Sequence, residues 1–180
     1  MKILFYDMGS YTYQDFLYYL EKAGHTCKTI FYHFPDKYED DFFCWRFTQY
    51  LQENTYDVVI SVNFFPLVAQ LCNQHHIKYI SWCYDSPMEN RLKDYFYYDT
   101  NYIFLFDRIE VTQYRAEGYD HVFHLPLAVN TERLSSLSFT PRQIASYQAD
   151  ISFVGHLYDS PLDALLYNTD SYIKGYIEGI

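Results

Sequence analysis

The sequence predicts an α/β fold with a mostly parallel sheet, and two observations support this prediction. Strand-like apolar runs recur along the chain, and each stops at a polar residue; the runs are Met1–Asp7, Tyr56–Asn63, Ile77–Tyr84 and Tyr102–Asp107. A helix-like stretch then follows each run. This alternation is typical of parallel strands that are joined by right-handed helical crossovers.

The residues at which these runs stop are candidates for function. They are Asp7, Asn63, Asp85 and Asp107, with Asp85 the first residue of an Asp-Ser-Pro turn. Open α/β sheets bind ligands outside the carboxyl ends of their strands. We therefore expect the functional site at this edge of the sheet.

The individual elements follow from apolar periodicity and from the residues that end each segment. Thr12 is a predicted N-cap, Pro66 suits a first helical turn, and Gly24 and Gly118 stand where helices stop. The predicted strands are 2–6, 26–32, 57–62, 77–83, 102–106 and 121–125, and the predicted helices are 12–23, 38–54, 66–75 and 108–116. We expect a Rossmann-like three-layer sandwich with strand 2–6 central and strands 57–62 and 77–83 beside it.

The domain organisation changes after Asn130. Residues 1–130 are predicted to form the Rossmann-like domain, and the Ser/Thr-rich residues 131–149 read as a linker. A new strand at 150–154, followed by Gly155, predicts that residues 150–180 are the first βα unit of a second, truncated domain. Its apolar residues would need cover, so we expect residues 150–180 either to dock on the first domain or to mediate self-association.

Composition and motifs exclude several function classes. The net charge is −10 with 13 Lys and Arg residues, which argues against nucleic-acid binding. The turn after the first strand holds one glycine, Gly9, instead of a dinucleotide fingerprint, and neither the cysteines nor the histidines have metal-ligand spacing. We expect no cofactor, no metal, no membrane span and a cytoplasmic location.

The 22 tyrosines leave two interpretations open. A tyrosine-lined cleft would suit a carbohydrate, because aromatic faces stack on sugar rings. Many of these tyrosines nevertheless fall at helix or strand spacing, where they are typical of core and boundary positions. The structural interpretation carries the greater weight.

Four segments resemble the N-terminal half of spore-maturation-protein-type glycosyltransferases. They are Ile80–Pro87, Phe104–Asp107, Leu125–Asn130 and Ile151–Gly155, in the same order and spacing. The resemblance implies the acceptor-side domain of a two-domain GT-B glycosyltransferase, which transfers sugar from a nucleotide-sugar donor to an acceptor. Most of the donor site would lie in the second domain, so donor, acceptor and activity are expected for the full-length protein only, without a divalent ion.

The resemblance also implies roles for individual residues. Asp85 is the candidate general base, and Gly155 corresponds to a remnant of the donor loop. The expected substrate-binding residues are Asp7, Gly9, Asn63, Trp82, Asp107 and Asn130. Two alternatives remain open: Asp85 could serve only as a turn residue, and the chain could be a stand-alone, non-catalytic module that binds a ligand or a protein.

Overall fold

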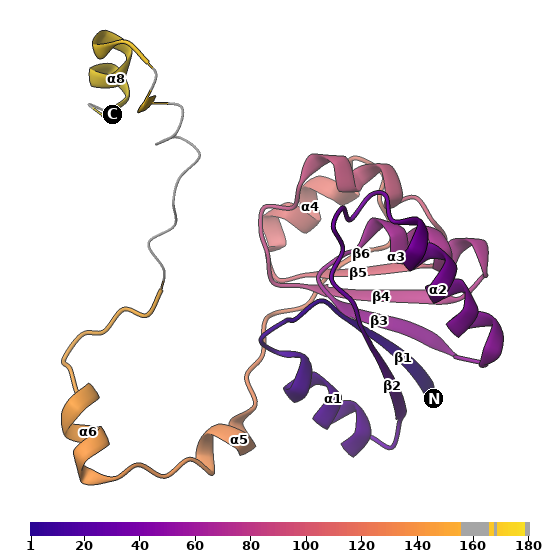
Figure 1. Cartoon of the computed structure of the whole chain (residues 1–180), viewed down its shortest axis with the longest axis horizontal. Coiled ribbons are helices and arrows are strands. Elements are labelled where there is room, and N and C mark those ends of the chain that lie inside the picture. Colours follow the sequence, from indigo (N-terminus) through magenta and orange to yellow (C-terminus); the bar gives the residue numbers. More distant parts are fainter. Residues whose placement is uncertain (156–165, 168, 179–180) are drawn as a thin grey trace. The chain divides into compact units, whose positions relative to one another are not determined.

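The computed structural model describes residues 1–155, 166–167 and 169–178 (Figure 1). The chain divides into two compact units, Met1–Ser135 and Ser136–Ile180. The first unit thus extends beyond the expected boundary at residue 130.

A six-stranded, all-parallel sheet forms the centre of the first unit. Its strands are β1 (Lys2–Asp7), β2 (Thr26–Phe31), β3 (Val58–Val62), β4 (Lys78–Cys83), β5 (Asn101–Leu105) and β6 (Val122–His124). They are arranged in the order β2-β1-β3-β4-β5-β6, and every neighbouring pair is parallel. The predicted α/β fold class is confirmed.

The predicted position of the first strand is wrong. β1 lies beside the edge strand β2, whereas β3 and β4 occupy the middle of the sheet. β3 does pair with β1, but β4 pairs with β3 and β5 and is not a neighbour of β1. The reason is that the chain adds β4, β5 and β6 successively outward from β3 instead of returning to β1.

The predicted helices form close to their expected bounds. They are α1 (Tyr13–Lys22), α2 (Asp41–Glu53), α3 (Pro66–Gln74) and α4 (Arg108–Ala116), and a 3-10 helix that was not predicted, η1, spans Asn90–Tyr95. Gly24 and Gly118 adopt φ values of 83° and 97°, a conformation that glycine accepts at helix ends. α2 starts later than expected because the Asp40 carboxylate accepts a hydrogen bond from the Phe43 amide at 2.8 Å.

The two faces of the sheet are covered unequally. Figure 1 shows α2, α3 and α4 on one face and α1 on the other. The larger core includes Leu4, Tyr6, Val59 and Tyr79 on the first face, while α1 covers a smaller cluster of β1 and β3 residues. Five side chains of β4, β5 and β6 on the α1 side remain only partly buried; these are Ile80, Trp82, Tyr102, Phe104 and Phe123.

The chain after β6 contains short helices. α5 (Thr131–Ser135) belongs to the first unit, and α6 (Pro141–Tyr147) and α8 (Ser171–Glu178) belong to the second. α6 starts within the expected linker, where Thr140 and Gln143 form a reciprocal capping box.

The strand predicted at 150–154 is wrong. Ile151, Phe153 and Val154 are at least 90% exposed and lie in an irregular segment. An apolar run forms a strand only when a neighbour pairs with its backbone, and the described residues provide none for this segment. Self-association through residues 150–180 stays a prediction.

Tyr79 ties β4 to the turn after β3, and removing its hydroxyl group is expected to weaken the fold. This buried hydroxyl lies 2.6 Å from Ser61 Oγ and accepts a hydrogen bond from the Phe65 amide at 3.0 Å. Tyr79→Phe would leave that amide without its acceptor, so we expect a loss of about 1–3 kcal/mol in the free energy of unfolding, measured by urea denaturation. The matched change Tyr11→Phe, at a side chain that is 93% exposed, should have no effect. Equal stability of the two variants would contradict this role.

Candidate functional site

The polar residues at the carboxyl ends of the strands mainly hold the connecting turns. Asn63 follows β3 with a φ of 66°, and its Oδ1 accepts hydrogen bonds from the amides of Tyr84 (3.0 Å) and Asp85 (3.4 Å). Its Nδ2 donates to Asp85 Oδ2 at 2.7 Å. Asn63 therefore joins the turn after β3 to the turn after β4 and holds the exposed carboxylate of Asp85.

A buried glutamate that the sequence did not indicate fixes the other side of the Asp85 turn. Glu110 is 7% exposed and accepts hydrogen bonds from Ser86 Oγ (2.9 Å), the Met88 amide (2.8 Å) and the Tyr114 hydroxyl (2.9 Å). Asp107 caps the helix that carries Glu110 by accepting from the amides of Ile109 (2.7 Å) and Glu110 (3.2 Å). Asp107 is thus an N-cap residue.

Asp7 shapes the turn between β1 and α1. Its side chain is buried, and its Oδ1 accepts hydrogen bonds from the amide (3.0 Å) and hydroxyl (2.8 Å) of Ser10. Gly9 occupies this turn with a φ of 97°, which a residue with a side chain rarely adopts. Asp7 Oδ2 is buried with no hydrogen-bond partner among the described residues.

A cavity of about 370 Å³ lies beside α1 within the first unit. Its wall has three parts: one side of α1, the Trp82 side chain near the end of β4, and the segment that follows β6. The lining residues are Thr12, Asp15, Phe16, Tyr19, Leu20, Trp82, Leu125, Pro126, Ala128, Val129 and Asn130. The Phe16 and Trp82 rings contact one another, with their centroids 5.4 Å apart.

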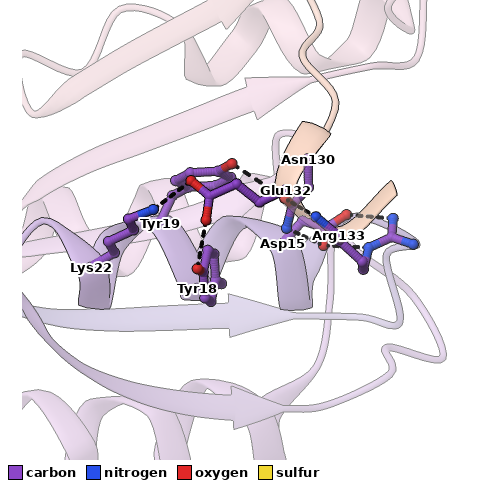
Figure 2. Close-up of polar contacts among 7 residues, drawn as sticks. All are labelled: Asp15, Tyr18, Tyr19, Lys22, Asn130, Glu132 and Arg133. Carbon is purple, nitrogen blue, oxygen red and sulfur yellow. Dashed lines mark hydrogen bonds and ion pairs between the residues drawn. The ribbon is translucent and has the colours of Figure 1, made fainter. Parts of the chain in front are cut away.

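The third part of the wall belongs to a segment that we call the strap, residues 125–135. The strap runs from the end of β6 to α1, where Arg133 forms a two-pronged ion pair with Asp15 (Figure 2). Both nitrogen–oxygen distances, from Nε to Oδ1 and from Nη2 to Oδ2, are 2.8 Å. Asn130 Nδ2 also donates to Asp15 Oδ1 at 3.0 Å. Hydrogen bonds from Arg133 and Asn130 lower the pKa of Asp15.

A second set of contacts joins the strap to the next turn of α1. Glu132 pairs with Lys22 and accepts a hydrogen bond from the Tyr18 hydroxyl at 2.9 Å, as Figure 2 shows. The Tyr19 hydroxyl donates to Asn130 Oδ1 at 3.2 Å. The hydrogen bond from Lys22 lowers the pKa of Glu132. The carboxylates of Asp15 and Glu132 therefore form these contacts in their ionised state.

The structure brings two of the expected site residues, Trp82 and Asn130, into this one cavity. Asp7, Gly9, Asn63, Asp85 and Asp107 lie at the ends of their strands but do not line it. Gly155 belongs to the second unit and follows the exposed segment 151–154.

Sequence reasoning missed the α1 part of the site. Asp15, Tyr18, Tyr19 and Lys22 share one side of α1 because they are spaced three or four residues apart. That spacing was the available signal, but it does not identify Asn130, Glu132 and Arg133 as their partners.

Two features are absent from the part of the chain that the structure describes. It contains no group of three side chains that could hold a metal ion. Its helices all fall short of the length and apolar character needed to cross a membrane.

No family model, curated protein or solved structure matches this chain. The geometry of the first unit therefore carries the functional argument.

Asn63 provides a test of the turn that holds Asp85. Asn63→Ala would remove the acceptor for the Tyr84 amide and place alanine at a positive φ, so we expect a loss of about 1–3 kcal/mol in the free energy of unfolding. Asn63→Gly tolerates the φ and should cost less. The difference in unfolding free energy between the two variants, measured by urea denaturation, gives the cost of placing a side chain at this positive φ. Asn63→Ala as stable as the wild type would contradict the proposed role.

The strap provides a second test. Arg133→Ala should speed amide hydrogen exchange in residues 131–135 at neutral pH, because α5 loses its ion pair with Asp15. Arg108→Ala, which removes an equivalent charge from the start of α4, is the matched control and should leave this exchange unchanged.

The same contacts predict a pH dependence. The pKa values of Asp15 and Glu132 are lowered from 3.8 and 4.5, so their stabilisation is complete above these values and is lost as the pH falls through the lowered values. The protection factors of the α5 amides, which correct the measured exchange for its intrinsic pH dependence, should therefore fall on acidification more in the wild type than in Arg133→Ala. Identical pH profiles would show that the Asp15–Arg133 pair does not hold the strap.

Proposed function

We propose that the first unit is the acceptor-side domain of a GT-B-type glycosyltransferase and that it holds the acceptor in the cavity beside α1. The observation that carries this proposal is the place of the cavity in the fold. Trp82 lies near the carboxyl end of a central parallel strand, and the strap residues follow the end of β6. Ligands of open α/β sheets bind on this side of the sheet.

The family resemblance supports the same position for the acceptor site, the cavity beside α1. Two of its segments, Ile80–Pro87 and Leu125–Asn130, are far apart in the sequence, yet both contribute to the cavity wall. Five of the six residues in Leu125–Asn130 line the cavity, the exception being Leu127. The aromatic rings of Phe16 and Trp82 supply flat apolar surfaces of the kind on which a ring-shaped ligand packs.

Charge argues that the donor binds elsewhere. A nucleotide-sugar diphosphate needs cationic side chains or aligned amides to offset its charge. The residues that line the cavity include no lysine, arginine or histidine, and the net charge of the chain is −10. We therefore propose that this chain binds acceptor and does not bind the donor tightly.

Asp85 is our candidate for the general base of sugar transfer in the presence of a donor-binding domain. Its carboxylate is exposed at the end of β4 and is oriented by Asn63 Nδ2. A base must reach the acceptor hydroxyl within hydrogen-bond distance, and Asp85 stands outside the cavity wall. The acceptor would therefore have to extend from the cavity toward Asp85.

A stand-alone binding module is the second candidate, and one observation favours it. The only carboxylate that lines the cavity, that of Asp15, is occupied by Arg133 and Asn130. The cavity itself therefore offers binding without an acid or base.

We propose a cytoplasmic location both for a glycosyltransferase domain and for a stand-alone binding module. All four cysteines are free thiols, as is usual in a reducing compartment.

Calorimetric titration of the whole chain tests the proposal. We expect no binding heat and no sugar transfer with UDP-, GDP- or dTDP-sugars, and weak binding of simple glycosides that serve as acceptor mimics. Micromolar affinity for any nucleotide sugar would overturn the division of roles. Asp85→Asn should leave glycoside binding unchanged and reduce transfer only when the donor-binding half is present; unchanged transfer there would reject Asp85 as the base.

A further inference from the structure

The wall of the cavity is mostly carbon. Phe16, Leu20, Leu125, Pro126 and Val129 contribute apolar side chains from α1 and the strap. Trp82 adds its ring, whereas its Nε1 has essentially no accessible surface and no hydrogen-bond partner among the described residues. The hydroxyl of Thr12 is buried and unpartnered in the same way. A ligand in the cavity therefore meets ring and aliphatic surface rather than these polar atoms.

The remaining polar groups of the wall are already engaged. Asn130 Oδ1 accepts hydrogen bonds from the Tyr19 hydroxyl (3.2 Å) and the Arg133 amide (2.9 Å), and Asn130 Nδ2 donates to Asp15. Both oxygens of Asp15 accept from the guanidinium of Arg133. A sugar ring needs several hydrogen bonds to replace those it makes to water, and this wall has few to give.

The charge of the lining residues and the volume of the cavity narrow the class of ligand further. The charge of Asp15, the one carboxylate among the lining residues, is engaged by Arg133, and the lining residues include no cationic side chain, so an anionic group finds no counter-charge in the wall. A cavity of about 370 Å³ lies at the lower end of the range for small-molecule sites. It matches one ring system rather than an oligosaccharide.

We infer that the cavity takes an uncharged apolar ring, so that the aglycone of the acceptor enters it while the sugar or the reacting hydroxyl stays outside. This inference rests on the proposed acceptor-binding function and names the chemical class of the group that is bound. Burial of an apolar ring against Phe16 and Trp82 supplies the affinity. The hydroxyl that receives the new sugar would then face the carboxyl edge of the sheet, where Asp85 lies.

The two tryptophans allow a direct measurement. Trp45 lies on α2 and is 57% exposed, so Trp45→Phe leaves Trp82 as the sole indole without changing the cavity. In this variant of the 180-residue chain, the Trp82 indole N–H gives one signal in a nitrogen–proton correlation spectrum. Its shift reports ligand entry next to Trp82.

The probes are phenyl β-glucoside, benzyl alcohol, glucose and phenyl phosphate. We expect saturable shifts of the Trp82 signal with phenyl glucoside and, more weakly, with benzyl alcohol, and no shift with glucose or phenyl phosphate. Ala128→Phe, which fills the cavity, should weaken phenyl glucoside binding about tenfold or more. Leu127→Phe, on the neighbouring residue that does not line the cavity, should leave the affinity within about twofold.

The outcomes separate this inference from the proposed function. If glucose binds as tightly as phenyl glucoside and Ala128→Phe has no effect, the acceptor function stands and the apolar-ring inference fails. If benzyl alcohol binds and phenyl glucoside does not, the inference about the apolar ring stands and the glycoside-acceptor function fails. If no probe shifts the Trp82 signal, both fail. Folding of each variant is checked from the amide signals of the same spectrum.

Discussion

The unequal cover of the two faces of the sheet is the constraint on which the rest of the first unit depends. A parallel sheet has to bury both faces, and α2, α3, η1 and α4 bury most of one of them. On the other face α1 covers β1 and β3, and the aromatic residues of β4 to β6 stay partly open. The cavity lies where the sheet surface covered by α1 ends, at Trp82, and the strap forms the opposite wall.

The contacts that hold the strap against α1 therefore keep the far wall of the cavity in place. The two ion pairs of the strap, Lys22–Glu132 and Arg133–Asp15, lie at the surface, where such pairs individually stabilise little in water. Several of them act on one short segment, and Asp15 is shared between Arg133 and Asn130. Such an arrangement fixes the position of a cavity wall while leaving the wall easier to displace than a packed core helix.

The sequence was sufficient for most elements of the first unit and insufficient for the order of its strands. Apolar runs and the residues that end them, such as Gly24, Pro66 and Gly118, predict local structure because turns and helix ends have local requirements. The place of β1 next to the edge depends on the pairing of distant strands. The predicted strand at 150–154 had the right composition, but a strand also needs a partner, and composition does not provide one.

The candidate site divides in the same way. Trp82 and Asn130 were expected from motif resemblance, and the polar strand ends were expected to lie at one edge because the sheet is parallel. The Asp15–Arg133 pair joins residues 118 positions apart, and no local pattern couples them. Glu110 was missed because a carboxylate on a short helix usually faces water. Two of the donors that compensate its burial, Ser86 and Met88, lie in the distant turn after β4, and Tyr114 on α4 is the third.

The buried tyrosines set an alkaline limit on the fold. Burial raises the pKa values of Tyr6, Tyr79 and Tyr114 above their usual range, and it raises the pKa of Tyr119 to about 12. These phenols stay protonated in the folded chain at a pH where the unfolded chain ionises them, so stability is retained below a pH of about 10 and declines above it. The same tyrosine rings that pack the core therefore make the fold sensitive to strong base.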